Sequence, residues 1–164
     1  MSNLHYLIGD ATEPTKRPAL IIHVCNDVGG FGKGFVVPLS EKYPEVKRKY
    51  KEWYATGTMK LGQVQFVQVE SDVCIANMIA QHDIVWQGKT PPIRYEALNE
   101  CLKLAYDKAA KENLTVAMPR IGANLSGGDW GRIEKIILAN MTVDSYVYTL
   151  EKQRNQWPTD YDSL

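Results

Sequence analysis

The chain has 164 residues, equal numbers of acidic and basic side chains, and a formal net charge of zero. This length gives one domain with a substantial core and is hardly enough for two. A neutral chain has no overall basic field that would attract nucleic acid, so only a local patch remains as a route to such a partner.

Apolar runs, turn residues and helical periodicity divide the chain into alternating strands and helices. In chain order we expect strands at 4–8 and 19–25, helices at 34–42 and 44–54, strands at 64–69 and 73–79, a helix at 93–112, a strand at 114–121, a helix at 129–138 and a strand at 142–150. The run at 19–25 is continuously apolar, which is typical of a strand buried on both faces. Ser71 and Asp72 form a turn signal that predicts an antiparallel hairpin.

This alternation predicts an α/β fold, a three-layer α/β/α domain with a central mixed β-sheet. We assign residues 1–150 to this single domain. Residues 151–164 have no apolar period and predict a loosely attached C-terminal tail.

The cysteines and the apolar runs favour a cytoplasmic protein. Cys25, Cys74 and Cys101 lie among apolar neighbours without CxxC spacing, as buried thiols do in a reducing compartment. The first residues lack the charge and apolar length of a signal peptide, and no apolar run is long enough to span a bilayer. No His, Cys and Asp spacing resembles a zinc site, so we expect no metal and no cofactor. We also expect a monomer without a membrane partner.

Two glycine-rich loops each follow an apolar run and lead into an expected helix. The first is Asp27-Val28-Gly29-Gly30-Phe31-Gly32-Lys33-Gly34, and the second is Gly122-Ala123-Asn124-Leu125-Ser126-Gly127-Gly128. Backbone N–H groups at such a helix entrance favour a phosphate, because the unpaired donors and the helix dipole both point at it. The pair of loops predicts a grip on the two phosphates of a diphosphate ligand. A Walker motif is excluded, since the first loop lacks the closing Gly-Lys-Ser/Thr order.

With these loops, the sequence resembles the macrodomains, the ADP-ribose-binding fold. The resemblance covers about residues 4–150, and its motifs are Ile8-Gly9-Asp10, Cys25-Asn26 with the first loop, Met118-Pro119-Arg120-Ile121-Gly122 and Val147-Tyr148-Thr149-Leu150. More closely, the chain is similar to the class of the terminal ADP-ribose protein glycohydrolase and the DNA ADP-ribosyl glycohydrolase antitoxins. Segments 23–35 and 76–82 resemble stand-alone bacterial ADP-ribosyl hydrolases.

The resemblance implies a set of ligand contacts. Asp10 would accept a hydrogen bond from the adenine amino group, Tyr148 would stack near the adenine, and Asn26 would lie beside the distal ribose. The first loop would wrap the distal ribose and one phosphate, and the second loop would cover the diphosphate. The ADP-ribose-binding residues implied in this way are Asp10, Ala11, Asn26, Gly29, Gly30, Phe31, Gly32, Lys33, Gly34, Ile121, Gly122, Ala123, Asn124, Leu125, Ser126, Gly127 and Tyr148.

The mechanism expected from the resemblance departs from that of the protein glycohydrolase. There a lysine and an aspartate perform covalent catalysis, and the matching positions here are Ala80 and Ser126. Neither residue supplies an amine or a carboxylate, so we expect an ordered water to attack the anomeric carbon of the distal ribose. Asn26, Gln81 and His82 are the candidate catalytic residues. The chain is thus expected to be an ADP-ribosyl hydrolase acting on ADP-ribosylated protein, with ADP-ribosylated nucleic acid also open as a partner.

Structural and functional alternatives remain open at several of these positions. Asp10 also fits a plain turn residue, Asn26 a strand-end cap, Lys33 a solvated loop charge, and His82 a structural or solvent-facing side chain. His23 is expected to have a packing or surface role in its strand. The rival functions are a non-catalytic ADP-ribose reader, an ADP-ribose 1″-phosphate phosphatase and a general nucleotide sensor. The cleaved linkage depends on the rim, which we place at residues 83–91.

Overall fold

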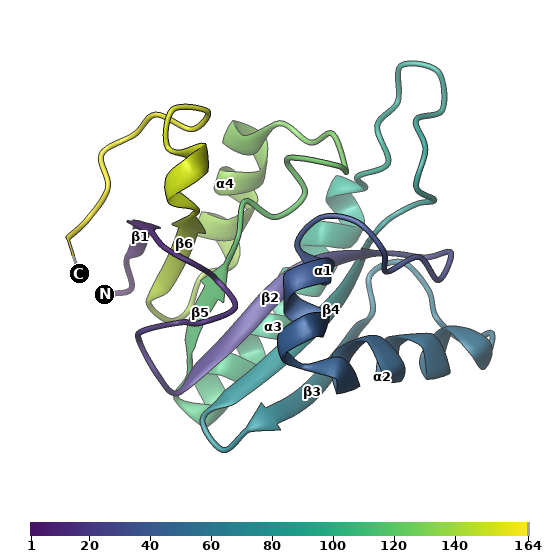
Figure 1. The fold of residues 1–164 in the computed structure, drawn as a ribbon, viewed down its shortest axis with the longest axis horizontal. Helices are drawn as coiled ribbons and strands as arrows, with labels where there is room; N and C mark the ends of the chain where they lie inside the picture. Colours follow the sequence, from purple (N-terminus) through teal and green to yellow (C-terminus); the bar gives the residue numbers. More distant parts are fainter. Residues whose placement is uncertain (164) are drawn as a thin grey trace.

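Six strands form one mixed sheet in the order β1-β6-β5-β2-β4-β3 (Figure 1). The structure is a computed structural model and describes residues 1–163. The strands are β1 (Leu4–Ile8), β2 (Ala19–Asn26), β3 (Val64–Glu70), β4 (Val73–Gln81), β5 (Thr115–Met118) and β6 (Ser145–Thr149). The helices are α1 (Val36–Lys42), α2 (Pro44–Ala55), α3 (Tyr95–Glu112), α4 (Trp130–Asn140) and the short 3-10 helix η1 (Glu151–Gln153). All neighbouring strands are parallel except β3 and β4, which form the expected antiparallel hairpin.

Two cores cover the two faces of the sheet, because alternate residues of each buried strand point to opposite sides. Ile22 of β2 packs with α3 and α4 in one core, and its neighbour Ile21 packs with α1 and α2 in the other. The expected three-layer α/β/α fold with a mixed sheet is therefore confirmed. None of the helices within residues 1–163 is long and apolar enough to cross a membrane.

Because β2 lies at the centre of the sheet, the loops that follow β2, β4 and β5 lie at the same edge of the sheet. Strand β2 lies between β4 and β5, runs parallel to both, and is buried along most of its length. The carboxyl ends of these three strands therefore open at one edge of the sheet, which is where ligands bind in open α/β folds. A register shift between Cys25 and Asn26 makes Asn26 the pairing partner of Gln81.

Some expected elements are longer than the observed ones. The strand expected at 114–121 ends at Met118, because Pro119 follows and Gly122 adopts φ 72°. The helix expected at 93–112 begins at Tyr95. Ile93 is held outside it by a bridge to Gln81 and by its N–H, which donates to the carbonyl of Ser126 at 3.0 Å.

The tail returns to the domain and lies along β1. The Asp162 N–H donates to the Tyr6 carbonyl at 2.8 Å, and the Asp162 carboxylate lies 2.9 Å from Nδ1 of His5. The Trp157 ring packs on the guanidinium of Arg120, 4.8 Å from its centre. Although its composition predicts loose attachment, the tail makes specific contacts with residues before 150.

Candidate functional site

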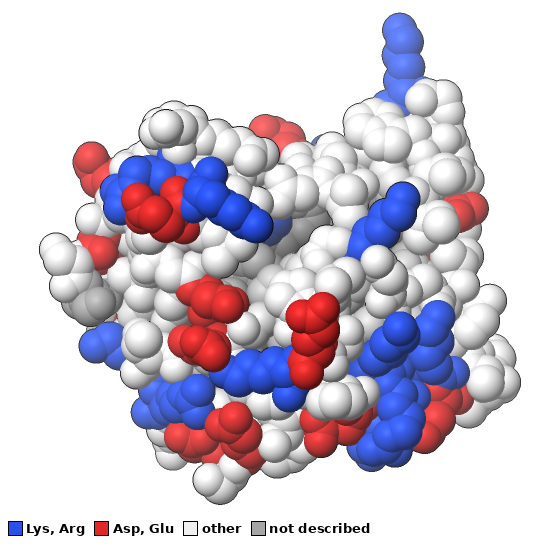
Figure 2. All heavy atoms as spheres, in the orientation of Figure 1, with Lys and Arg blue, Asp and Glu red and all other residues white. Residues whose placement is uncertain are grey.

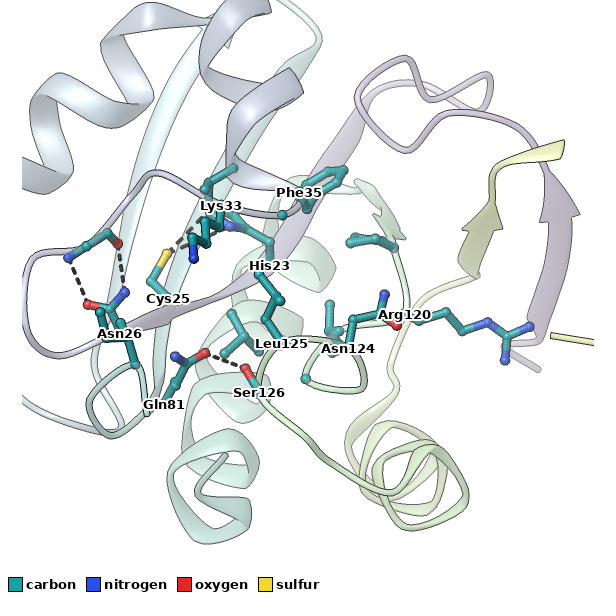
Figure 3. A pocket seen from close by; sticks show the side chains of 18 of the residues that line it. His23, Cys25, Asn26, Lys33, Phe35, Gln81, Arg120, Asn124, Leu125 and Ser126 are labelled. Atoms are coloured by element: carbon teal, nitrogen blue, oxygen red, sulfur yellow. Dashed lines mark hydrogen bonds between the residues drawn. The ribbon is translucent and has the colours of Figure 1, made fainter. Parts of the chain in front are cut away.

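A cavity of about 510 Å³ lies at the carboxyl ends of β2, β4 and β5. Figure 2 shows it as a hollow near the middle of the molecular face, and Figure 3 shows the side chains around it. The two glycine-rich loops form opposite walls. This volume lies within the usual range of small-molecule sites.

The cavity brings together many of the residues expected to bind the ligand. On its wall are Asn26, Gly30, Gly32, Lys33, Gly34, Gln81, Ile121, Gly122, Asn124, Leu125 and Ser126. Outside the wall lie Asp10, Ala11, Gly29, Phe31, His82, Ala123, Gly127 and Tyr148. The wall also includes side chains that the sequence did not single out as site residues, above all His23, Cys25, Phe35 and Arg120.

The amide of Asn26 organises the first glycine loop. Its Oδ1 accepts from the Val28 N–H at 3.0 Å, from the Gly30 N–H at 2.9 Å and from the Tyr50 hydroxyl at 3.0 Å. Its Nδ2 donates to the Gly30 carbonyl at 2.7 Å, which leaves one N–H for a ligand (Figure 3). Asn26 therefore caps the loop, which is one of the two alternatives left open by the sequence. It also lies on the cavity wall, where its contact with the distal ribose stays a prediction.

Gln81 and Ser126 connect the end of β4 to the second loop. The Ser126 hydroxyl donates to Oε1 of Gln81, and Nε2 of Gln81 donates to the Asp83 carbonyl at 2.8 Å (Figure 3). Both side chains are buried, so their orientation is fixed by these bonds. The arrangement presents a hydroxyl and an amide next to Asn26, groups that hold a water or a sugar hydroxyl but do not take a proton at neutral pH.

His82 lies outside the cavity wall and pairs with Asp27. Its Nδ1 is 2.8 Å from one carboxylate oxygen of Asp27, and the other oxygen accepts from the Asp83 N–H at 2.8 Å. This arrangement ties the first loop to the segment after β4. Asp27 thus has a clear structural role, and the His82 ring is engaged in the same link.

The two residues expected at the adenine have local partners of their own. One carboxylate oxygen of Asp10 accepts from the N–H and from the hydroxyl of Thr12, at 2.9 and 2.8 Å, which closes a turn. The hydroxyl of Tyr148 accepts from the Thr15 N–H at 3.1 Å, and its ring packs against Gly9. Neither residue lies on the cavity wall, so the contacts with adenine stay a prediction.

A buried polar cluster forms part of the cavity floor. Nε2 of His23 lies 2.5 Å from Oδ1 of Asn77, and the Cys25 sulfur lies 3.7 Å from Nδ1 of His23. Burial lowers the pKa of His23 to about 4 and raises the pKa of the Cys25 thiol. Both groups are therefore neutral at pH 7, and the cluster is no thiolate–imidazolium pair. A histidine inside a continuous apolar run is the sequence signal that points to this cluster.

The charges of the wall favour an anionic ligand. Lys33 and Arg120 are its basic residues, and no aspartate or glutamate of residues 1–163 lines the cavity. The Arg120 side chain points away from Gln81 and Ser126 in Figure 3, so its backbone and Lys33 are what face the cavity centre. No group of three His, Cys, Asp or Glu side chains within the described chain is placed to hold a metal ion.

Two glycines of the wall have backbones that side chains rarely adopt. Gly34 has φ 80°, and a Cβ there would lie 3.0 Å from Leu125 of the other loop. Gly122 has φ 72°, and a Cβ there would lie 2.9 Å from Ile93. Glycine at position 34 lets the two loops approach each other, and glycine at position 122 lets the second loop pack against Ile93.

Comparison with known proteins decides the family. No protein-family model matches the chain. The macrodomain protein from Streptomyces coelicolor is 42% identical in its solved structure, covers 90% of this chain and 99% of its own, and superposes with a TM-score of 0.79. The chain belongs to the macrodomain family.

Two relatives of this macrodomain differ in how much of their length it covers. The ADP-ribose 1″-phosphate phosphatase of Lodderomyces elongisporus is 24% identical over 158 residues, which are 89% of this chain and 98% of that protein. Chromodomain-helicase-DNA-binding protein 1-like of Mus musculus is 27% identical over 180 residues, with 99% of this chain covered. The macrodomain spans about a fifth of the length of that mouse protein, since the match covers 20% of it.

Proposed function

We propose that this macrodomain is an ADP-ribosyl hydrolase. It binds ADP-ribose and removes it from modified protein by attack of water at the anomeric carbon of the distal ribose. The observation that carries the proposal is that Asn26, Gln81 and Ser126 line one cavity whose walls include two glycine loops that suit a diphosphate.

Binding rests on the backbone of the two loops and on charge. The loop N–H groups and Lys33 hold the diphosphate, and the absence of carboxylates from the described wall removes repulsion. The remaining N–H of Asn26 donates to a hydroxyl of the distal ribose.

Catalysis rests on the position of the water. Gln81 and Ser126 orient it toward the anomeric carbon, and the bond from that carbon to the protein side chain breaks as the bond to the water oxygen forms. The proton of the water passes through a phosphate oxygen of the substrate to the departing side chain, because no carboxylate on the described wall accepts it. The diphosphate stabilises the oxocarbenium-like transition state by its negative charge. Ala80 is buried and apolar where the covalent route needs a lysine, which favours this direct route. His82, paired with Asp27, acts by holding the first loop to the segment after β4.

The second candidate is hydrolysis of a 1″-phosphate. It is favoured by the similarity to a protein named ADP-ribose 1″-phosphate phosphatase, of which the match covers 98%. This reaction breaks a phosphorus–oxygen bond instead of the glycosidic bond. The same pocket serves both candidates, so the released product separates them.

The test is single-turnover release of free ADP-ribose from a panel of defined ADP-ribosyl linkages, with ADP-ribose affinity measured by calorimetry. We expect wild type to act on at least one linkage. Gln81→Ala should slow release by roughly 100-fold or more with a small change in affinity, because it removes a group that acts on the water. Asn26→Ala should weaken both the binding of ADP-ribose and its release from the linkage, because the first loop loses the side chain that accepts two of its backbone N–H groups.

Other outcomes contradict the proposal in distinct ways. Binding without release from any linkage would leave a reader of ADP-ribose. Release of inorganic phosphate from ADP-ribose 1″-phosphate, with all linkages intact, would assign the phosphatase. Melting curves of both variants control for loss of folding.

A further inference from the structure

Five exposed apolar side chains belong to the three loops that form the cavity. They are Val28, Ile84, Val85, Trp86 and Leu125, and we name them the apolar collar. Ile84 and Leu125 also line the cavity, so the collar continues its wall outward. Ile84, Val85 and Trp86 are 60%, 57% and 53% exposed, which is costly for three consecutive apolar residues in the absence of a partner.

Contacts with glycines hold the collar in place. A Cβ built on Gly30 would lie 3.5 Å from Ile84, and one on Gly34 would lie 3.0 Å from Leu125. Ile84 and Leu125 thus rest on glycines of the first loop, and Trp86 packs against Gly127 of the second loop. Because the side chains are seated in this way, the collar is a formed surface around the opening.

The segment that carries most of the collar is itself anchored. It projects between β4 and α3 in Figure 1. Gln87 and Thr90 exchange two backbone hydrogen bonds of 3.0 Å, and the Arg94 guanidinium donates to the Pro91 carbonyl at 2.7 Å. At its base the Asp83 N–H donates to Asp27. A preformed apolar projection of this kind binds with little loss of conformational freedom.

The charges around the collar indicate the chemistry of its partner. The carboxylates of Asp27 and Asp83 already accept backbone N–H groups. Lys33 and Lys89 have no carboxylate partner among the described residues. Lys33 is assigned above to the diphosphate, so the surface is apolar with Lys89 as its available cation, and Figure 2 shows the projecting segment as mainly uncharged.

This composition fits a peptide better than a nucleic acid strand. A strand requires a row of cations along its phosphates and aromatic rings for successive bases. The collar has one aromatic ring, Trp86, and four aliphatic side chains. Aliphatic contacts match the apolar side chains of a polypeptide.

We propose that the apolar collar docks the peptide that carries the ADP-ribose. The preferred segment has a large apolar side chain next to the modified residue and an acidic residue that pairs with Lys89, because Lys33 is assigned to the diphosphate. The inference rests on the proposed function, which places the anomeric carbon, and hence the attached chain, at the mouth of the cavity.

The experiment compares four ligands by fluorescence anisotropy competition: free ADP-ribose, two peptides modified on a serine and an ADP-ribosylated oligonucleotide. One peptide has leucine and aspartate beside the modified serine, and the other has glycine and serine there. Wild type should bind the leucine peptide about tenfold more tightly than the glycine peptide, as burial of one large apolar side chain provides. In Val85→Ser and Trp86→Ser this preference should fall to about twofold or less, with the affinity for free ADP-ribose unchanged.

Leu138→Ser is the matched control, because Leu138 lies on α4 and is 49% exposed outside the collar. It should keep the full preference. Equal binding of both peptides by wild type, with ADP-ribose still bound, overturns the collar proposal alone. Loss of binding to free ADP-ribose overturns the proposed function as well. Tighter binding of an ADP-ribosylated oligonucleotide than of either peptide overturns the choice of a peptide partner.

Discussion

His23 shows how a single side chain links the cavity to the stability of the sheet. Its ring is fully enclosed between Phe31 and Phe35, and its bond to Asn77 reaches across to β4. Asn77 in turn donates to Gln65 of β3 at 3.0 Å. A polar chain therefore runs from the cavity floor through two strands, and it needs a neutral imidazole.

The pKa of His23 predicts a pH dependence of folding. The folded pKa is about 4, against about 6.5 in an unfolded chain, so below pH 6.5 the unfolded state binds the extra proton first. The stability that depends on the neutral ring of His23 is fully present above pH 6.5 and is lost as the pH falls toward 4. The total decrease in the free energy of unfolding is about 3 kcal/mol. Urea unfolding between pH 7 and 4 should therefore show a shallower pH slope in His23→Gln than in wild type. Equal slopes in the two proteins would refute this.

At the scale of residues, the expected site residues that line the cavity include side chains at strand ends, whereas His23 and Cys25 within β2 line it without having been expected there. Asn26 and Gln81, which the family resemblance implied as site residues, stand at the ends of β2 and β4 and line the cavity, and their part in catalysis stays a prediction. His23 and Cys25 share one face of β2, two residues apart. The histidine within the apolar run marks a polar position there, but the run does not show that this face borders a cavity. The partners of Asp10 and Tyr148 were missed because they come from the turn at residues 12–15.

At the scale of elements, one cation joins the tail to two other segments, in addition to the contacts of Asp162 with β1. The guanidinium of Arg120 lies within 5.1 Å of the ring centres of Tyr6, Trp130 and Trp157. These rings come from β1, α4 and the tail, so the cation joins three segments. The sequence predicted the strands and helices from periodicity, but tail attachment depends on a contact between residues 37 positions apart that no local pattern contains.

Two substitutions at Trp157 distinguish what its ring and its N–H each contribute to the free energy of unfolding. Nε1 of Trp157 is buried without a hydrogen-bond partner among the described residues. Trp157→Phe should keep or raise the free energy of unfolding, since it removes this unpaired donor and retains an aromatic face for Arg120. Trp157→Ala should lower it by roughly 1–3 kcal/mol. Chemical denaturation measures both, and equal destabilisation by Phe and Ala would show that the ring face is not what holds the tail.

For the whole molecule, the cavity is the place where both halves of the fold meet. Its walls come from loops after β2, β4 and β5, and those strands carry the two cores on opposite faces. A ligand that touches all three loops binds only the folded chain, so its binding free energy adds to that of folding. Composition and periodicity predicted the layers, because burial of apolar faces determines them. The approach of loops from distant parts of the chain depends on packing that follows from the complete fold.

This coupling predicts a thermal shift. ADP-ribose at 100 times its dissociation constant should raise the free energy of unfolding by about 2.7 kcal/mol and Tm by roughly 5–10 °C.

Gly34→Val should abolish most of the shift, because φ 80° is strained for valine and its side chain would meet Leu125 across the opening. Gly57→Val is the matched control, since Gly57 has φ 74° and open space around it, away from the cavity wall. It should lower Tm without ligand and retain the shift with ADP-ribose. A full shift in Gly34→Val would place the ligand elsewhere on the protein. AMP should give a smaller shift than ADP-ribose at equal concentration, because AMP lacks the second phosphate and the distal ribose that the two loops and Asn26 are proposed to hold.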